Sequence, residues 1–122
     1  MNVLETKNAP GAFGPYSQGY EANGFVFTSG QIPVDPATGT VPEGSRAQAE
    51  RSGKNVGAIL EAAGTGFDRG IKTTCFLADM GDFAAFNEVY ATYFTSRPAR
   101  SCVAVKDLPK GVACEIESIA VK

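Results

Sequence analysis

Histidine is missing from this chain of 122 residues, and its three cysteines are widely spaced. Without histidine, neither a Ser-His-Asp nor a Cys-His catalytic arrangement is available, and the commonest metal ligand is absent. The cysteines, Cys75, Cys102 and Cys114, form no C-x-x-C pair. Any acid–base chemistry must therefore use carboxylates, tyrosine, lysine, a thiol or bound water.

The sequence also lacks a cluster of basic residues and an apolar run of membrane-spanning length. Its net charge is −2, which argues against nucleic-acid binding through a phosphate-neutralising patch. Met1–Thr6 does not have the charged and then apolar order of a signal peptide. An odd number of distant cysteines favours free thiols in a reducing compartment. We therefore expect a cytoplasmic protein that binds neither nucleic acid nor a membrane.

What the chain does contain is the composition of an ordinary globular protein, with 43% apolar and 20% charged residues. This length suits one domain with a modest core, so we expect a single domain over residues 1–122. The hydrophobic periodicity predicts these elements in chain order: strands at 2–6, 18–22 and 25–29, a helix over 45–63, a strand over 71–78, a helix over 82–94, and strands over 97–105 and 112–120.

Local signals set several of these boundaries. Asn23-Gly24 is the strongest short hairpin signal in the chain. Ser45 and Gln48 have the S-x-x-Q spacing of a capping box, which predicts the start of the first helix. Gly64 predicts its end.

Two later segments are predicted to be largely buried. In the strand over 71–78, Ile71, Cys75 and Leu77 alternate onto one apolar face. In the helix over 82–94, aromatic residues recur at helical spacing and predict a buried stripe. They are Phe83, Phe86, Tyr90, Tyr93 and Phe94.

The last two predicted strands carry opposite charges. We expect them to form a hairpin through residues 106–111, with Arg100 and Cys102 on one face of the first strand and Glu115 on the second. A guanidinium and a carboxylate on adjacent strands are costly to bury unless they are paired or bind a ligand. The alternative is an edge hairpin whose charges are simply exposed.

The balance of helices and strands predicts self-association. Two amphipathic helices cover one face of a sheet of about five or six strands. The predicted strands nevertheless carry apolar residues on both faces, for example Phe25 and Phe27 opposite Val26. We therefore expect an obligate homo-oligomer in which another copy covers the second face.

Five short motifs occur in order along the chain and together resemble one family. They are Gly14-Pro15-Tyr16-Ser17-Gln18, Thr28-Ser29-Gly30-Gln31-Ile32-Pro33, Phe86-Asn87, Pro98-Ala99-Arg100-Ser101-Cys102-Val103, and Leu108-Pro109-Lys110-Gly111 followed by Glu115-Ile116-Glu117. The sequence resembles the Rid/YjgF family of reactive-intermediate deaminases over essentially its whole length.

The resemblance implies a fold and an activity. The fold is a chorismate-mutase-like α+β fold, with a mixed sheet of about six strands, two helices packed on one face, and assembly as a homotrimer with sites at subunit interfaces. The activity is hydrolysis of 2-imino acids and their enamine tautomers, such as 2-iminobutanoate and 2-iminopropanoate, to 2-keto acids and ammonia. Neither a metal nor a cofactor is implied. The substrates are reactive compounds that leak from pyridoxal-phosphate-dependent enzymes.

Carried over residue by residue, the resemblance assigns the catalytic roles to Arg100 and Glu115. Arg100 matches the arginine that binds the substrate carboxylate, a role that suits its planar fork of donors. Glu115 matches the carboxylate near the hydrolytic water. The matching substrate-binding positions are Tyr16, Ser29, Gly30, Asn87, Arg100 and Cys102, of which Gly30 and Cys102 act through their main chain.

One segment departs from the family pattern. The stretch before Pro98 is Thr95-Ser96-Arg97, which is shorter than usual and lacks the usual aromatic residue. A shorter and more basic approach would alter the size of the pocket or favour larger or more acidic substrates.

The residues also leave other functions open. The same arginine would serve a mutase or an isomerase, and the chain could instead be a non-catalytic carboxylate-binding sensor or a chaperone-like trimer. Cys102 is a less favoured candidate nucleophile, because no histidine base is present to activate it. Ribonuclease activity, sometimes attached to this family, agrees poorly with the acidic net charge and the lack of histidine.

Overall fold

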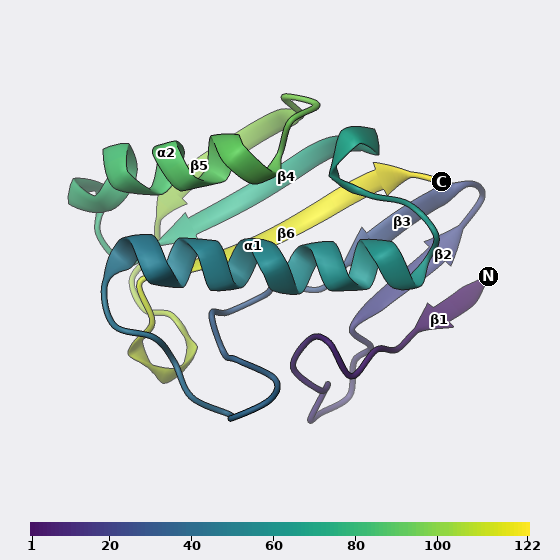
Figure 1. The fold of residues 1–122 in the computed structure, drawn as a ribbon, viewed down its shortest axis with the longest axis horizontal. Coiled ribbons are helices and arrows are strands. Elements are labelled where there is room, and N and C mark those ends of the chain that lie inside the picture. Colours follow the sequence, from purple (N-terminus) through teal and green to yellow (C-terminus); the bar gives the residue numbers. More distant parts are fainter.

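Six strands form one mixed sheet in the order β1-β2-β3-β6-β4-β5, and two helices lie against it (Figure 1). The computed structural model describes residues 1–122. Neighbouring strands are antiparallel except β4 and β5, which are parallel. Neither helix has an apolar segment long enough to cross a membrane. The strands are β1 (Asn2–Leu4), β2 (Gly19–Ala22), β3 (Phe25–Thr28), β4 (Gly70–Leu77), β5 (Ala99–Ala104) and β6 (Cys114–Val121), and the helices are α1 (Ser45–Ala62) and α2 (Phe83–Tyr93).

The first hairpin forms where the sequence predicts it. Ala22 pairs with Phe25, so that only Asn23 and Gly24 lie in the turn between β2 and β3. Both turn residues have positive φ angles, 52° and 81°. Two consecutive positive φ angles characterise the type I′ turn, whose twist matches that of the flanking strands. The prediction is therefore confirmed.

The last two strands do not form the predicted hairpin. β4 lies between β5 and β6, and pairs with both. The reason is α2, because a helical crossover returns the chain parallel to the strand it left and so places β5 beside β4 at the sheet edge. Residues 105–113, which include a short 3-10 turn at Pro109–Gly111, then carry the chain past the end of β4 to β6. Alternating polarity predicts the strands correctly but does not determine which of them pair.

The start of α1 also differs from its prediction. The residue before the helix is Gly44, with φ 92°, and no side chain caps the first turn. Gln48 does not reach back to the helix start, because its Oε1 accepts a hydrogen bond of 2.7 Å from the Ala113 N–H. The capping box is thus replaced by a tertiary bond that ties α1 to the segment before β6. The end of the helix is as predicted, with Gly64 at φ 81°.

The core lies between the helices and one face of the sheet. Val56, Ile59 and Leu60 of α1 have no exposed surface, and Phe86 of α2 is 1% exposed. The remaining aromatic residues of the predicted α2 stripe pack against the same core or belong to it, which confirms that stripe. Complete burial of a side chain of this size contributes about 1.5–3 kcal/mol.

Ile71 does not share the buried face of Cys75 and Leu77, contrary to its prediction. The pairing of β4 with β6 shifts register between Gly70 and Lys72. An extra residue in one strand reverses the side-chain alternation beyond it. Ile71 is therefore 42% exposed, whereas Cys75 and Leu77 are buried.

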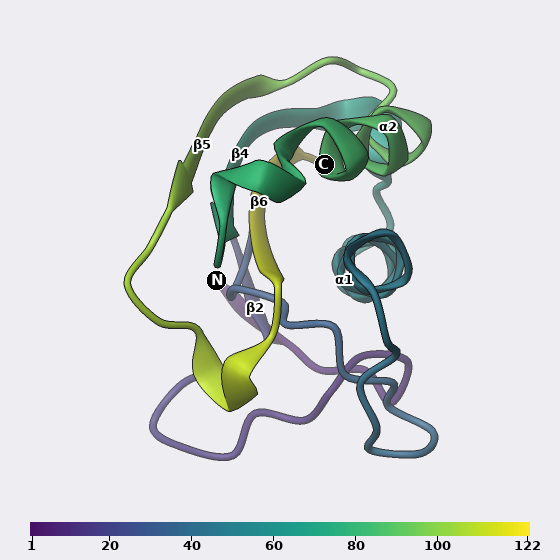
Figure 2. The same cartoon turned by 90° about the vertical axis from the view of Figure 1, so that its left-hand side faces the viewer.

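The face of the sheet opposite the helices is uncovered and partly apolar. Both helices pack on the other face, and Figure 2 shows α1 on one side of β2, β4 and β6. Phe25 and Phe27 are 40% and 41% exposed and contact each other on this open face, with ring centroids 6.5 Å apart. Tyr20 and Val103 lie on the same face and are 41% and 46% exposed. The sequence prediction of an apolar second face without a cover inside the chain is correct.

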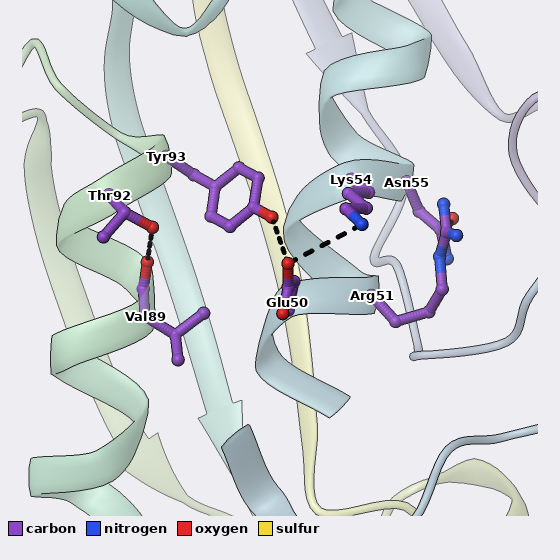
Figure 3. Close-up of polar contacts among 7 residues, drawn as sticks. All are labelled: Glu50, Arg51, Lys54, Asn55, Val89, Thr92 and Tyr93. Carbon is purple, nitrogen blue, oxygen red and sulfur yellow. Dashed lines mark hydrogen bonds and ion pairs between the residues drawn. The ribbon is translucent and has the colours of Figure 1, made fainter. Parts of the chain in front are cut away.

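Polar side chains link α1 and α2 on their outer surface (Figure 3). Tyr93 Oη donates a hydrogen bond of 3.0 Å to Glu50 Oε1, and Lys54 Nζ lies 3.6 Å from the same oxygen. Arg51 Nε donates to Asn55 Oδ1 at 3.2 Å within α1. An exposed ion pair such as that of Lys54 and Glu50 contributes about 0.2–1 kcal/mol. Of these contacts, the Tyr93–Glu50 hydrogen bond is the one that joins the two helices.

Candidate functional site

The residues singled out from the sequence form two separate groups. The arginine cluster comprises Asn87, Tyr90, Arg100 and Cys102, and lies where α2 covers the edge strand β5. The glutamate cluster comprises Tyr16, Ser29, Gly30 and Glu115, and lies where the loops after β1 and β3 meet the start of β6.

Arg100 is held by side chains of α2. Its Nη1 donates a hydrogen bond of 2.7 Å to Asn87 Oδ1. Its guanidinium carbon lies 4.7 Å from the centre of the Tyr90 ring and 5.6 Å from that of Phe83. A cation over an aromatic face is attracted by the ring quadrupole, by about 0.5–2 kcal/mol according to its desolvation. The guanidinium of Arg100 is thus oriented while most of its N–H donors remain available.

Tyr90 is itself fixed by the core. Its hydroxyl lies 2.6 Å from Thr73 Oγ1 on β4, and its ring stacks on Phe94 with centroids 4.4 Å apart. Burial raises the pKa of the Tyr90 hydroxyl, so it remains a neutral hydrogen-bonding group. Sequence reasoning assigned Tyr90 to the core stripe alone. Its place three residues after Asn87, on the same helix face, is the signal that links it to the site.

A cavity of about 610 Å³ adjoins the arginine cluster. Its lining includes Asn87, Tyr90, Arg97 and Arg100, with Phe94 and Pro98 as an apolar part of the wall. Arg100 makes no ion pair in the chain, since the three ion pairs present involve other residues. A half-buried arginine without a carboxylate partner, at the edge of a cavity, is suited to binding an anion.

Glu115 dominates the second cluster. Its carboxyl is half-buried at the start of β6, and this burial, with a smaller contribution from the charge of Glu117, raises its pKa above the usual range. Gly30 lies directly against it, so closely that a side chain at position 30 would collide with the Glu115 carboxylate. Two backbone hydrogen bonds between Gln31 and Ile116, of 2.7 and 3.2 Å, hold the two segments at this spacing.

Ser29 and Tyr16 occupy the loop side of the glutamate cluster. Ser29 Oγ donates a hydrogen bond of 2.5 Å to the Ser17 carbonyl, so this hydroxyl joins two loops rather than pointing freely into a pocket. Tyr16 is 57% exposed. Tyr16 and Gly30 line one cavity of about 260 Å³, together with Phe13 and Lys110. Sequence reasoning missed Phe13 and Lys110, although Lys110 belongs to one of the motifs quoted for the family.

Two buried amides position these loops. Gln18 Nε2 donates to the carbonyls of Thr6, Ala9 and Pro10 at 2.8–3.2 Å, and its Oε1 accepts from the Thr6 N–H at 2.7 Å. Asn55 of α1 donates to the carbonyl oxygens of residues 32 and 34 at 3.1 and 2.9 Å. Buried backbone groups outside regular structure need such partners. Gln18 therefore fixes the loop after β1, and Asn55 fixes the segment that follows Gly30.

A single chain does not bring Arg100 and Glu115 together. Arg100 pairs in register with Thr73, which is buried beneath the helices. Glu115 pairs with Phe76, whose side chain points to the open face. The two charges therefore lie on opposite faces of the sheet with β4 between their strands, and the prediction that they occupy adjacent strands is wrong. The physical reason is the insertion of β4 described above.

The cysteines of the structure are free thiols, as expected. Cys102 is half-buried in register with Cys75, and burial raises the pKa of both thiols, to about 12 for Cys75. A raised pKa leaves little thiolate at neutral pH, which disfavours nucleophilic catalysis by Cys102. No group of three or more Cys, Asp and Glu side chains converges in a way that could hold a metal ion.

Comparison with solved structures places the chain in a known structural class. The crystal structure of Escherichia coli TdcF with bound serine superposes with a TM-score of 0.96, at 50% identity over 100% of this chain and 99% of that one. The E. coli YjgF gene product also gives a TM-score of 0.96, at 49% identity over 100% of this chain and 99% of that one. The protein therefore has the YjgF-like α+β fold, which confirms the fold class expected from the sequence.

Sequence comparison identifies the family. A family model described as endoribonuclease L-PSP matches residues 6–122. The 2-iminobutanoate/2-iminopropanoate deaminase of Salmonella typhimurium is 53% identical over 124 aligned residues, which cover 98% of this chain and 97% of that protein. The chain belongs to the endoribonuclease L-PSP family, the Rid/YjgF proteins of the sequence resemblance.

Proposed function

We propose that this protein is a 2-iminobutanoate/2-iminopropanoate deaminase. The observation that carries the proposal is Arg100, a guanidinium that is oriented by Asn87 and Tyr90 but lacks a carboxylate partner. The deaminase activity named for the Salmonella relative supports the same conclusion, as does the serine bound to TdcF, because serine also carries a carboxylate beside a nitrogen-bearing carbon.

Hydrolysis of the imine requires correct positioning of the substrate and a water molecule more than activation of the substrate. Arg100 binds the carboxylate of the 2-imino acid through two parallel charge-assisted hydrogen bonds. The backbone N–H of Gly30 has no hydrogen-bond partner within the chain and contributes a further donor. Fixing the substrate relative to one water molecule removes much of the entropic cost of the reaction, by up to several kcal/mol.

Glu115 acts on the water. The carboxylate accepts a proton as the water oxygen adds to C2 of the protonated imine, and then returns this proton to the nitrogen. The carbinolamine hydroxyl gives its own proton to Glu115 as the C–N bond breaks, ammonia leaves, and the 2-keto acid remains, so that one water is consumed per imine. A raised pKa makes Glu115 a better proton acceptor than an ordinary carboxylate, which suits a group that accepts and then returns a proton.

The active site is completed by a neighbouring copy of the chain in a homotrimer. Arg100 and Glu115 lie on opposite faces of one sheet, so a site that uses both requires Arg100 from one protomer and Glu115 from the next. The open apolar face, with Phe25, Phe27 and Val103 exposed, supplies the surface for such an assembly. Sedimentation of the purified protein should give about three times the chain mass of 12.7 kDa.

A non-catalytic alternative is a trimer that binds carboxylates or acts as a chaperone. Turnover separates the two readings: the wild type should accelerate the formation of 2-ketobutanoate from freshly generated 2-iminobutanoate. A protein that binds 2-ketobutanoate but leaves the spontaneous rate unchanged would support the binder instead.

The sharpest test mixes two inactive variants. Arg100→Ala and Glu115→Gln should each be nearly inactive alone. The two variants are unfolded and refolded together in equal amounts. About one quarter of the sites in random trimers would then be intact, because a site is intact only when its Arg100 comes from the Glu115→Gln chain and its Glu115 from the Arg100→Ala chain. Recovery of about one quarter of wild-type activity is the expected result. Mixed trimers, verified by mass spectrometry, that remain inactive would contradict a shared site.

A further inference from the structure

Arg97 stands at the turn that connects α2 to β5. Its φ angle is 54°, in the left-handed region that residues other than glycine and asparagine rarely adopt. Its backbone N–H donates a hydrogen bond of 3.2 Å to the Phe94 carbonyl, which fixes this turn. The side chain is exposed and forms no ion pair.

The location of Arg97 places its positive charge at the cavity next to Arg100. It lines the same cavity of about 610 Å³ as Arg100, and no acidic residue lines that cavity. Arg97 thus differs from Arg46, which lies 2.6 Å from Glu88, and from Lys122, which lies 3.1 Å from Glu21. Two guanidinium groups that share a cavity without a carboxylate repel each other and attract an anion that can touch both.

The cavity is also large for a small monocarboxylate. An imino acid of three or four carbons whose carboxylate lies on Arg100 would fill only part of this volume. The lining combines the two arginines with the apolar side chains of Phe94 and Pro98. A short aliphatic chain with a charge at each end matches this combination of cationic and apolar surface.

We propose that Arg97 is a specificity residue that binds a second carboxylate, so that this protein hydrolyses 2-imino dicarboxylates of four or five carbons. The C1 carboxylate lies on Arg100 and the distal carboxylate on Arg97. This inference rests on the proposed deaminase function and extends it to a substrate class. The reaction is unchanged: water adds to C2, the C–N bond breaks, and a 2-keto dicarboxylate and ammonia are released.

The test compares two imines on the same enzyme. 2-Iminosuccinate and 2-iminobutanoate are generated in situ by amino-acid oxidases, and kcat/KM is measured for both with the wild type, Arg97→Gln and Arg97→Lys. Arg97→Gln should lower the ratio of the dicarboxylate to the monocarboxylate kcat/KM by about tenfold, chiefly through KM, because one charge-assisted contact is lost. Arg97→Lys should restore part of the ratio, since it keeps the charge but not the planar fork.

Arg46→Gln is the matched control, because it removes an exposed arginine that does not line the cavity. Its ratio should equal that of the wild type. An unchanged ratio in Arg97→Gln would refute the proposed role of Arg97 and leave the deaminase function standing. A wild type that hydrolyses 2-iminobutanoate but not 2-iminosuccinate would do the same. A wild type that hydrolyses neither imine would instead refute the deaminase function itself, so the two failures are distinguishable.

Discussion

The arginine cluster and the glutamate cluster are built in different ways. Arg100 stands on a strand and is held by the rings and amide of a helix, so its position depends on side-chain packing. Glu115 stands where two loops meet a strand, and its position depends on backbone hydrogen bonds between Gln31 and Ile116. The proposed anion-binding group is thus held by side chains of a helix, whereas the proposed proton-transfer group stands on β6 beside loops that buried amides hold in place.

The two clusters also differ in charge and in the face they occupy. The arginine cluster has no carboxylate at its cavity, and Glu115 makes no ion pair. β4 keeps the two clusters apart within one chain, so the proposed site that uses both requires two protomers.

The largest effect should come from removing the charge of the arginine cluster. In the proposed site, Arg100→Ala deletes one partner of a desolvated ion pair with the substrate, a loss that typically costs about 2–5 kcal/mol. We expect kcat/KM for 2-iminobutanoate to fall by about a thousandfold, while the assembly persists because Arg100 makes no ion pair in the fold. Arg100→Lys should recover little activity, since lysine lacks the planar fork. Near-normal turnover by Arg100→Ala would make this residue merely structural.

Removing the proposed proton-transfer group of the glutamate cluster should lower activity less than Arg100→Ala does. Glu115→Gln keeps the shape of the side chain but cannot accept a proton, so we expect kcat to fall by about a hundredfold with KM little changed. In the wild type, activity should decline as pH falls through the raised pKa of Glu115, because the carboxylate form is needed. Stopped-flow pH profiles of both proteins measure this, and an unaltered profile in the variant would assign the proton transfer elsewhere.

The same variant should show an opposite effect on stability. A carboxyl whose pKa is raised by folding binds more protons in the native state, so its contribution to stability decreases as pH rises from the unfolded to the folded pKa. Glu115→Gln removes this penalty. Its thermal midpoint should exceed that of the wild type at pH 7, and the difference should shrink at acidic pH. Equal midpoints at pH 7 would mean that burial of Glu115 carries no cost.

A moderate effect should follow from loosening the arginine cluster without touching its charge. Tyr90→Phe keeps the ring beneath Arg100 but loses the hydrogen bond to Thr73, which is worth about 1 kcal/mol. We expect a loss of about fivefold in kcat/KM. Thr73→Val removes the same bond from the other side and should give a similar loss. A much larger loss in Tyr90→Phe than in Thr73→Val would point to direct contact of the hydroxyl with substrate.

Removing the thiol of Cys102 should have the smallest effect on activity. The raised pKa of Cys102 leaves it protonated, so its sulfur is not expected to act as a nucleophile. Cys102→Ser and Cys102→Ala should retain activity within about threefold of wild type, because the backbone is unchanged. A loss as deep as that of Glu115→Gln would restore the covalent mechanism.

Local features of the sequence determined most elements of the fold. The Asn23-Gly24 turn, the glycine end of α1 at Gly64 and the aromatic stripe of α2 depend on residues close in the chain, and each forms as predicted. The excess of apolar strand residues over helices likewise predicts an open face. The family motifs identify the candidate site residues but do not show how these residues are arranged in space.

Only the tertiary structure decided how these elements combine. The insertion of β4 between β5 and β6, the bulge that turns Ile71 outward, and the bond from Ala113 to Gln48 all involve partners distant in sequence. Periodicity reports which face of a strand is apolar but not which strand lies beside it, because pairing is set by the helical crossover and by packing of the whole sheet. For that reason Arg100 and Glu115 could be named from the sequence, whereas their separation onto opposite faces could not.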